Sequence, residues 1–331
     1  MSQRGGGVGV IGAGVVGLSA ALRILQEHDG TQVTIYANRF SPHTTGDGAA
    51  GFWEPYAVGD TPVGDIVRWG QETFEWIERL AQSEEAKESG TFYVSSCHIY
   101  HEHVEDPIWK DTVHGFRRMT GNELLHYPGH TCGFAYTTVM SEGCRYVKWL
   151  TKRCKTLGAI FIQKEISDLA EVSSHDIVVN CSGLGARELV GDASVFPIKG
   201  QIITTKAPWI KHCLNFDDEG VYMLVGSQNV YIGGSSEKGN EDPTPDPDQS
   251  KRIWNDITRL VPSLCGAERV GEWGGLRPGR PQVRLEAEEV SLTNGEILKV
   301  IHNYGHGGAG LTLHWGCAEQ CRRLIDQFYE Q

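Results

Sequence analysis

The chain has 331 residues, of which 40% are hydrophobic and 9% aromatic, which fits a globular protein with a substantial core. The formal net charge of −12 argues against nucleic acid as a partner and offers no basic patch for anionic lipid. No apolar run approaches the about 20 residues that a membrane span requires.

Nine cysteines are scattered along the chain, without a CxxC pair. We interpret them as reduced thiols of an intracellular protein, rather than a disulfide framework or a zinc site. Histidines are also dispersed, and their densest group, HEH at 101–103, lacks a second pair of ligands. We therefore expect this group to be a solvated loop.

The N-terminal segment has the clearest local pattern. An apolar run, GVGVI, is followed by GAGVVG at 12–17, a helical pattern, and a second apolar run, QVTIYA, at 32–37. This order is typical of a dinucleotide-binding βαβ unit. Gly12 permits the tight turn, Gly14 lets a pyrophosphate approach the backbone, and Gly17 lets the helix pack closely on the strand.

The end of the second strand departs from this pattern. Asn38, followed by Arg39, stands where an acidic residue normally binds the ribose hydroxyls. The asparagine can form one hydrogen bond, but without the charge-assisted component. The fingerprint alone therefore does not choose between NAD and FAD.

The remaining elements alternate and then become strand-rich. Apolar periodicity predicts helices over 67–80, 144–157 and 311–329, a buried strand within 176–186, and antiparallel strands over 200–207, 220–226 and 229–236. The acidic, proline-containing segment 238–251 predicts a solvated loop. The order favours an α/β fold whose nucleotide-binding pieces are separated in sequence.

Four segments make a resemblance specific: TTGDGAAGFWEPY (44–56), DIVVNCSGLGAREL (176–189), GLRPGRPQVRLE (275–286) and HNYGHGGAGLTLHWG (302–316). Together with the glycine fingerprint they resemble the D-amino-acid oxidase and D-aspartate oxidase family of flavoenzymes. This resemblance implies noncovalent FAD and a Rossmann-like FAD-binding domain with an interleaved antiparallel-sheet substrate domain. The FAD-binding domain is expected to comprise 1–55, 141–197 and 272–331, and the substrate-binding domain 56–140 and 198–271.

The resemblance also implies a set of cofactor contacts. The loop at 305–310 is expected beside the flavin, with the following helix pointing its N-terminus at the ring, where its dipole would stabilise an anionic reduced flavin. The expected cofactor-binding residues are Gly12, Gly14, Val15, Val16, Gly17, Asn38, Arg39, Thr44, Thr45, Gly51, Phe52, Ile166, Ser182, Gly183, Gly307, Gly308, Gly310, Leu311 and Thr312.

For catalysis, the resemblance assigns Arg284 to a bidentate bond with the substrate carboxylate and Tyr222 to a second bond with it. The carbonyl oxygen of Gly308 is expected to accept the substrate amine, and Arg277 and Arg280 to make structural or cofactor contacts. Orientation alone would then direct the Cα hydride to flavin N5. The products would be a 2-oxo acid, ammonia and hydrogen peroxide.

The expected side-chain pocket comprises Phe52, Glu54, Asn215, Leu224 and Ser236. Asn215 and Ser236 stand where the aspartate oxidases carry two arginines that bind an acidic side chain. A carboxylate at Glu54 would repel D-aspartate. We therefore predict neutral or basic D-amino acids as substrates, with acidic D-amino acids as the alternative, and with a second alternative in which Glu54 turns away to pair with a nearby arginine or with the backbone.

Two other function classes remain open at this point. One is a pyridine-nucleotide dehydrogenase, and the other is a flavin-binding protein without activity. The expected partners are a D-amino acid and molecular oxygen, with a homodimer as the expected assembly. Members of the family that the chain resembles are commonly peroxisomal, but the C-terminal residues FYEQ contain no peroxisomal import tripeptide. We therefore expect the protein in either the peroxisome or the cytoplasm.

Overall fold

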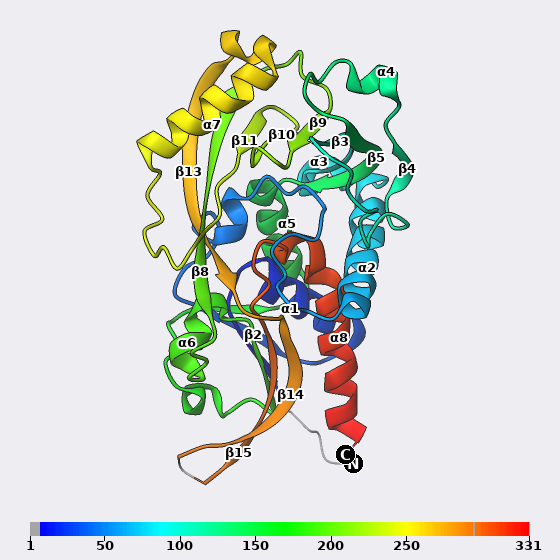
Figure 1. The fold of residues 1–331 in the computed structure, drawn as a ribbon. Helices are drawn as coiled ribbons and strands as arrows, with labels where there is room; N and C mark the ends of the chain where they lie inside the picture. Colours follow the sequence, from blue (N-terminus) through cyan, green and yellow to red (C-terminus); the bar gives the residue numbers. More distant parts are fainter. Residues whose placement is uncertain (1–6, 294, 331) are drawn as a thin grey trace.

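The fold contains two β-sheets, which lie one above the other in Figure 1. The structure, a computed structural model, describes residues 7–293 and 295–330. The α-helices are α1 (Val15–Glu27), α2 (Val63–Ala81), α3 (Ala86–Ser89), α4 (Gly121–Leu124), α5 (Gly143–Thr156), α6 (Ala186–Leu189), α7 (Pro247–Leu260) and α8 (Gly310–Glu330). Short 3-10 helices are η1 (Thr45–Gly48), η2 (Leu169–Val172), η3 (Gly183–Gly185) and η4 (Pro262–Gly266).

The first sheet is parallel apart from one edge strand. Its order is β14 (Arg284–Ser291), β15 (Ile297–Tyr304), β7 (Ile177–Asn180), β1 (Val8–Ile11), β2 (Val33–Ala37) and β6 (Ile160–Gln163), and only β14 runs antiparallel to its neighbour. All four residues of β1 are buried, as expected for a parallel strand covered on both faces. Helices α1, α5 and α8 share one core with this sheet.

The second sheet is larger and mainly antiparallel. Its order is β12 (Glu237–Lys238), β8 (Phe196–Lys206), β11 (Val230–Gly233), β10 (Val221–Val225), β9 (Cys213–Phe216), β3 (Thr91–Tyr100), β5 (Cys132–Ser141) and β4 (His114–Arg118), and β13 (Glu268–Gly279) also pairs with β8. Helix α7 covers it by burying Ile253 and Ile257 among apolar strand residues. Their i, i+4 spacing places both on one helix face.

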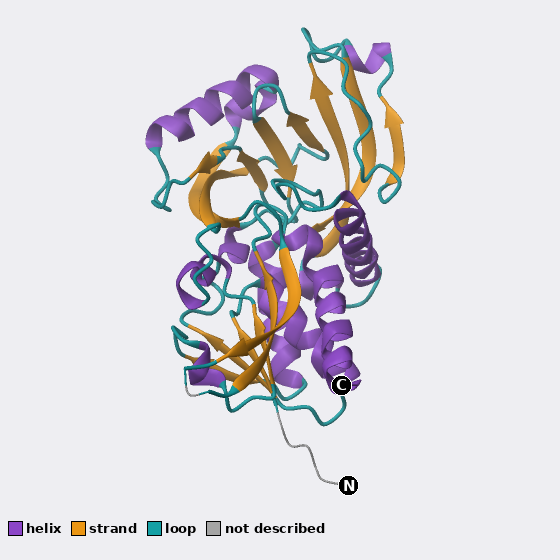
Figure 2. Cartoon of the chain, turned by 60° about the horizontal axis from the view of Figure 1, so that its bottom comes forward, coloured by secondary structure: helices purple, strands orange, loops and turns teal. Residues whose placement is uncertain are grey.

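Helix α2 links the two sheets. Its Phe74 and Ile77 join the aromatic core formed with β5, and its Trp76 stacks on Trp315 of α8 with 3.6 Å between ring centroids. Figure 2 shows α2 beside the long C-terminal helix and reaching the larger sheet. The two sheets are thereby held in a fixed relation, which positions the loops between them.

These elements confirm the predicted α/β class and most predicted segments. All nine cysteines are free, and none of the described helices is both long and apolar enough to cross a bilayer. The predicted loop at 238–251 is wrong over 247–251, because α7 begins at Pro247. Asp246 caps this helix by accepting hydrogen bonds from the backbone N–H groups of Asp248 (2.8 Å) and Gln249 (3.3 Å).

The predicted two-domain division stays a proposal. Most strands of the first sheet lie in the segments assigned to the FAD-binding domain. Most strands of the second sheet lie in the segments assigned to the substrate-binding domain. Strand β13 crosses the proposed boundary at residue 272, because it pairs with β8 along its whole length.

Candidate functional site

One large cavity lies where the loops of the two sheets meet. Its volume is about 1230 Å³, more than a drug-sized ligand needs, so it has room for a cofactor and a small substrate together. The segments that contribute to its wall include 11–17, 36–39, 44–46, 49–52, 164–167, 181–185, 215–217, 220–222, 234–237, 276–278, 303–308 and 310–312.

The glycine turn after β1 leaves open space for an anion. Gly12 has φ of 109°, and a Cβ there would come within 2.3 Å of the carbonyl oxygen of Cys181, so only glycine fits the turn. A Cβ on Gly14 would instead meet nothing within 4 Å. Helix α1 then begins at Val15 without a side-chain cap or an acidic residue in its first turn. Its free N–H groups can therefore receive a phosphate.

The second glycine-rich loop packs against the segment that follows Phe52. Gly307 has φ of 54°, and its N–H donates to the carbonyl oxygen of Pro278 over 2.8 Å. A Cβ on Gly308 would come within 2.4 Å of the Tyr56 ring. Thr312, in the first turn of α8, donates to the carbonyl oxygen of Glu54 over 2.8 Å. These contacts hold the N-terminus of α8 at the cavity wall.

A buried histidine adds an unpaired polar atom to this wall. Nε2 of His306 is buried and has no hydrogen-bond partner among the described residues. Burial lowers the pKa of His306 to about 4, so its ring is neutral near pH 7. A polar ligand would give this atom a partner.

All nineteen predicted cofactor-binding residues line the cavity. They are Gly12, Gly14, Val15, Val16, Gly17, Asn38, Arg39, Thr44, Thr45, Gly51, Phe52, Ile166, Ser182, Gly183, Gly307, Gly308, Gly310, Leu311 and Thr312. Their location agrees with the prediction, and their individual contacts with a cofactor stay predictions.

Arg284 is placed differently from its predicted position. It does not line the cavity, and its guanidinium donates to Glu286 (2.7 Å), Glu288 (2.8 Å) and the hydroxyl of Tyr304 (2.9 Å). Two carboxylates and a phenol therefore accept hydrogen bonds from all three nitrogens of its guanidinium. The expectation that Arg284 binds the substrate carboxylate is wrong for this geometry, because the side chain is already paired within the β14–β15 hairpin.

Arg277 reaches the cavity instead. Its Nη1 donates to the carbonyl oxygen of Ser235 over 3.1 Å, and its guanidinium lies 5.7 Å from the centre of the Tyr56 ring. A Cβ on Gly200 would come within 2.3 Å of the guanidinium carbon. No acidic side chain within 7–293 or 295–330 forms an ion pair with Arg277. Its charge is therefore available to an anion in the cavity.

Tyr222 lies near this guanidinium. Burial raises the pKa of Tyr222, and the positive charge of Arg277 opposes that shift. The ring packs against two glycines of the neighbouring strand end, since a Cβ on Gly233 would lie 2.3 Å from the ring and one on Gly234 2.7 Å. Tyr222 and Arg277 thus present a phenol and an unpaired guanidinium to one region of the cavity.

The predicted side-chain pocket is brought together as expected. Phe52, Glu54, Asn215, Leu224 and Ser236 all line the cavity. Among the described residues the Glu54 carboxylate pairs with neither of the expected partners, an arginine or the backbone; its Oε1 lies 3.6 Å from Nε2 of His98.

No sequence pattern distinguishes His98 as a candidate site residue. It is buried and its Nδ1 lies 2.8 Å from Oδ2 of Asp217, which also lines the cavity. Burial raises the pKa of Glu54, the charge of His98 opposes that rise, and Asp217 adds to it. One end of the cavity is therefore acidic, with a buried histidine between two carboxyl groups.

The chain is similar over nearly its whole length to proteins of one known family. Residues 8–324 match the family model described as FAD dependent oxidoreductase. The chain is 41% identical to the D-aspartate oxidase of Homo sapiens, over 97% of this chain and 94% of the relative. It is 37% identical to a D-amino-acid oxidase of Rubrobacter xylanophilus, over 95% of this chain and 94% of the relative.

Solved structures support the fold. A glycine oxidase from Geobacillus kaustophilus superimposes with a TM-score of 0.79 at 19% identity, over 97% of this chain and 94% of that one. The family match excludes the pyridine-nucleotide alternative, and it agrees with the uncapped start of α1, the open space at Gly14 and the size of the cavity. The chain therefore belongs to the FAD dependent oxidoreductases, and FAD is its cofactor.

Proposed function

We propose that this chain is an oxidase of D-amino acids that prefers neutral or basic side chains. The observation that carries the proposal is the unpaired guanidinium of Arg277 in a cavity that also holds Tyr222 and Glu54. Relatives named D-amino-acid oxidase, such as that of Dugesia ryukyuensis at 35% identity, support the reaction class.

In this proposal Arg277 takes the role first expected of Arg284. Its planar fork can donate two parallel hydrogen bonds to the substrate carboxylate, and the Tyr222 hydroxyl can donate a third. The backbone carbonyl oxygen of Gly308 accepts a hydrogen bond from the substrate amine. Binding at these three points fixes the orientation of the Cα–H bond.

FAD held by the loops around Gly14, Thr44 and Gly308 would supply an acceptor for the Cα hydride and a site of oxygen reduction, so that an amino acid, oxygen and water would give a 2-oxo acid, ammonia and hydrogen peroxide. The protein contributes orientation and charge. The neutral ring of His306 and the N-terminus of α8 add no negative charge to the cavity wall.

Side-chain preference follows from the acidic end of the cavity. Glu54 and Asp217 both line it, and Asn215, whose Nδ2 donates to Ser96 over 3.2 Å, offers no positive charge. A cationic side chain would be attracted there, a neutral one tolerated, and a carboxylate repelled. The second candidate is a D-aspartate oxidase, which the 41% identity to the human enzyme of that name favours.

A peroxide assay with the FAD-loaded protein tests the proposal. We expect D-alanine and D-arginine to be oxidised with higher kcat/KM than D-aspartate, and the L-enantiomers not to be oxidised. A higher kcat/KM for D-aspartate than for both other substrates would favour the second candidate. If the protein binds FAD but oxidises no amino acid, the proposal is wrong and the chain is a flavin-binding protein without this activity.

The assembly and compartment are also proposals. We keep a homodimer, and either the peroxisome or the cytoplasm, as the expectations to test by gel filtration and by imaging of the tagged chain.

A further inference from the structure

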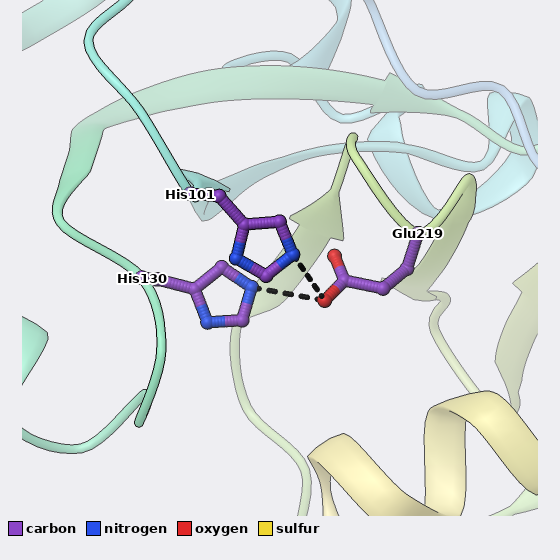
Figure 3. Close-up of side chains that lie close together, drawn as sticks. All are labelled: His101, His130 and Glu219. Carbon is purple, nitrogen blue, oxygen red and sulfur yellow. Dashed lines mark hydrogen bonds and ion pairs between the residues drawn. The ribbon is translucent and has the colours of Figure 1, made fainter.

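Three side chains from separate loops of the second sheet meet outside the cavity. His101 follows β3, His130 precedes β5, and Glu219 lies in the turn between β9 and β10. Oε1 of Glu219 lies 3.3 Å from Nε2 of His101 and 3.1 Å from Nε2 of His130. Figure 3 shows that both imidazole rings direct a ring nitrogen, Nε2 in each case, toward the carboxylate of Glu219.

The hydrogen bonds around the two rings define what those nitrogens are. Nδ1 of His101 lies 2.9 Å from the carbonyl oxygen of Gly129, and Nδ1 of His130 lies 3.3 Å from that of Tyr127. A carbonyl oxygen only accepts, so the Nδ1 of each ring carries a proton, and the Nε2 of each ring is the atom that faces Glu219. Two ring nitrogens and a carboxylate oxygen thus converge on one place, where a metal ion bound by both Nε2 lone pairs would satisfy all three atoms.

The spacing of these atoms fits a metal ion. With ligands about 2.0–2.2 Å from Zn²⁺ in tetrahedral geometry, neighbouring ligand atoms are about 3.3–3.5 Å apart, close to the two distances here. The Nδ1-to-carbonyl contacts are those that orient metal-binding histidines in known sites. The two rings stack nearly parallel, at 16° with 4.4 Å between their centroids, so the exposed His101 has to rotate until its ring plane contains the shared ion.

Burial adds a second reason for a cation. The side chain of His130 is 2% exposed and that of Glu219 is 12% exposed. Oε2 of Glu219 is buried without a hydrogen-bond partner among the described residues. A buried carboxylate with one unsatisfied oxygen is costly unless it is neutralised or coordinates a metal.

We propose that His101, His130 and Glu219 bind a divalent transition-metal ion of the Zn²⁺ class, with water in the remaining position. HEH at 101–103 supplies only one of the ligands, which is why the sequence expectation of a solvated loop missed the other two. The site would hold the β9–β10 turn, because Asp218 in the same turn accepts a hydrogen bond from the backbone N–H of His101 over 2.6 Å. Asp217 and Gly220 of this turn line the cavity, so the ion would fix part of the cavity wall.

Equilibrium dialysis of the chelator-treated, FAD-loaded protein against Zn²⁺, followed by elemental analysis, tests the proposal. We expect one bound ion per chain, and affinity reduced about 10-fold or more by His101→Ala or Glu219→Gln. His103→Ala is the matched control, because its side chain is 74% exposed and it lies outside the cluster. We expect it to bind Zn²⁺ as the unchanged chain does.

Hydrogen exchange of the backbone amides at 217–220 gives a second readout. Added Zn²⁺ should slow their exchange in the unchanged chain and in His103→Ala, but not in His101→Ala. Since His101 is exposed, its replacement should leave the fold intact. Absence of binding by the unchanged chain, which would mean that a proton satisfies the cluster, or equal binding by His101→Ala, would overturn the proposal.

Discussion

The guanidinium of Arg277 lies over the ring of Tyr56, 5.7 Å from the ring centre. Tyr56 also packs on Gly308, so the residue that supports the arginine contacts the loop that carries the proposed acceptor of the substrate amine. A cation–π contact holds a guanidinium in place without neutralising it. The geometry therefore couples the two groups proposed to bind opposite ends of the substrate's amino acid backbone.

Replacing the two arginines one at a time separates their roles. Arg277→Ala removes two charge-assisted hydrogen bonds, each worth about 1.5–3 kcal/mol, so we expect kcat/KM for D-alanine to fall by about 100-fold or more. Arg284→Ala should leave kcat/KM within about 10-fold and mainly lower the midpoint of thermal unfolding, because its partners belong to the β14–β15 hairpin. The reverse ranking would refute the assignment of Arg277.

Arg277→Lys is the conservative variant for this comparison. A lysine keeps the charge but loses the bidentate fork and the planar contact with Tyr56. We expect activity between those of the unchanged chain and Arg277→Ala, with the loss expressed chiefly in KM.

The two arginines also show where sequence reasoning reaches its limit. The segment 275–286 could be recognised as a site of carboxylate binding, but three arginines compete within it. Strand register decides between them: Arg277 pairs opposite Ile198 in the second sheet, whereas Arg284 pairs opposite Tyr304 in the first. Register depends on partners far away in sequence, so no local pattern contains it.

The glycine-rich cofactor loops were predictable for the opposite reason. The spacing of Gly12, Gly14 and Gly17 reflects contacts between neighbouring residues of one βαβ unit, and so it is visible in the sequence. The approach of His98 to Glu54 and Asp217 requires β3 to lie beside β9, with His98 opposite Asn215. That pairing joins strands more than 100 residues apart, and the sequence carries no sign of it.

Glu54 should control discrimination against acidic substrates. Because burial raises the pKa of Glu54, its negative charge is present only above that raised value. We expect the ratio of kcat/KM for D-arginine to that for D-aspartate to rise with pH as Glu54 loses its proton. In Glu54→Gln this part of the pH dependence should be lost and the ratio should fall, by about 10-fold at neutral pH. An unchanged ratio and pH profile in the variant would show that Glu54 does not face the substrate.

Asp192 should stabilise the fold in a pH-dependent way. Burial opposes its ionisation, but hydrogen bonds from Ser194, Arg280 and Tyr304 outweigh it and hold the pKa of Asp192 well below its usual range. A carboxyl group with a lowered folded-state pKa contributes stability above its unfolded pKa and loses it as pH falls through the folded one.

We therefore expect Asp192→Asn to lower the free energy of unfolding by about 2 kcal/mol at neutral pH, measured by urea denaturation. The difference from the unchanged chain should shrink as the pH is lowered below about 4. A difference that stays constant into acid would show that the charge of Asp192 is not what stabilises the fold.

Gly14 allows cofactor binding to be tested separately from folding. A Cβ at Gly12 would collide with the backbone of Cys181, so that substitution would disturb the turn itself. A Cβ at Gly14 meets no protein atom within 4 Å, and would project into the space where a phosphate must approach the first turn of α1.

Gly14→Ala should consequently fold as well as the unchanged chain when FAD is removed, and bind FAD about 10-fold or more weakly. The matched control is Gly64→Ala in α2, where a Cβ also meets nothing within 4 Å and alanine favours the helix. It should leave FAD affinity unchanged. Flavin fluorescence titration measures the affinity, and thermal unfolding of the FAD-free proteins checks the fold. If Gly14→Ala bound FAD as tightly as the control, the phosphate would have to approach the chain elsewhere than at the start of α1.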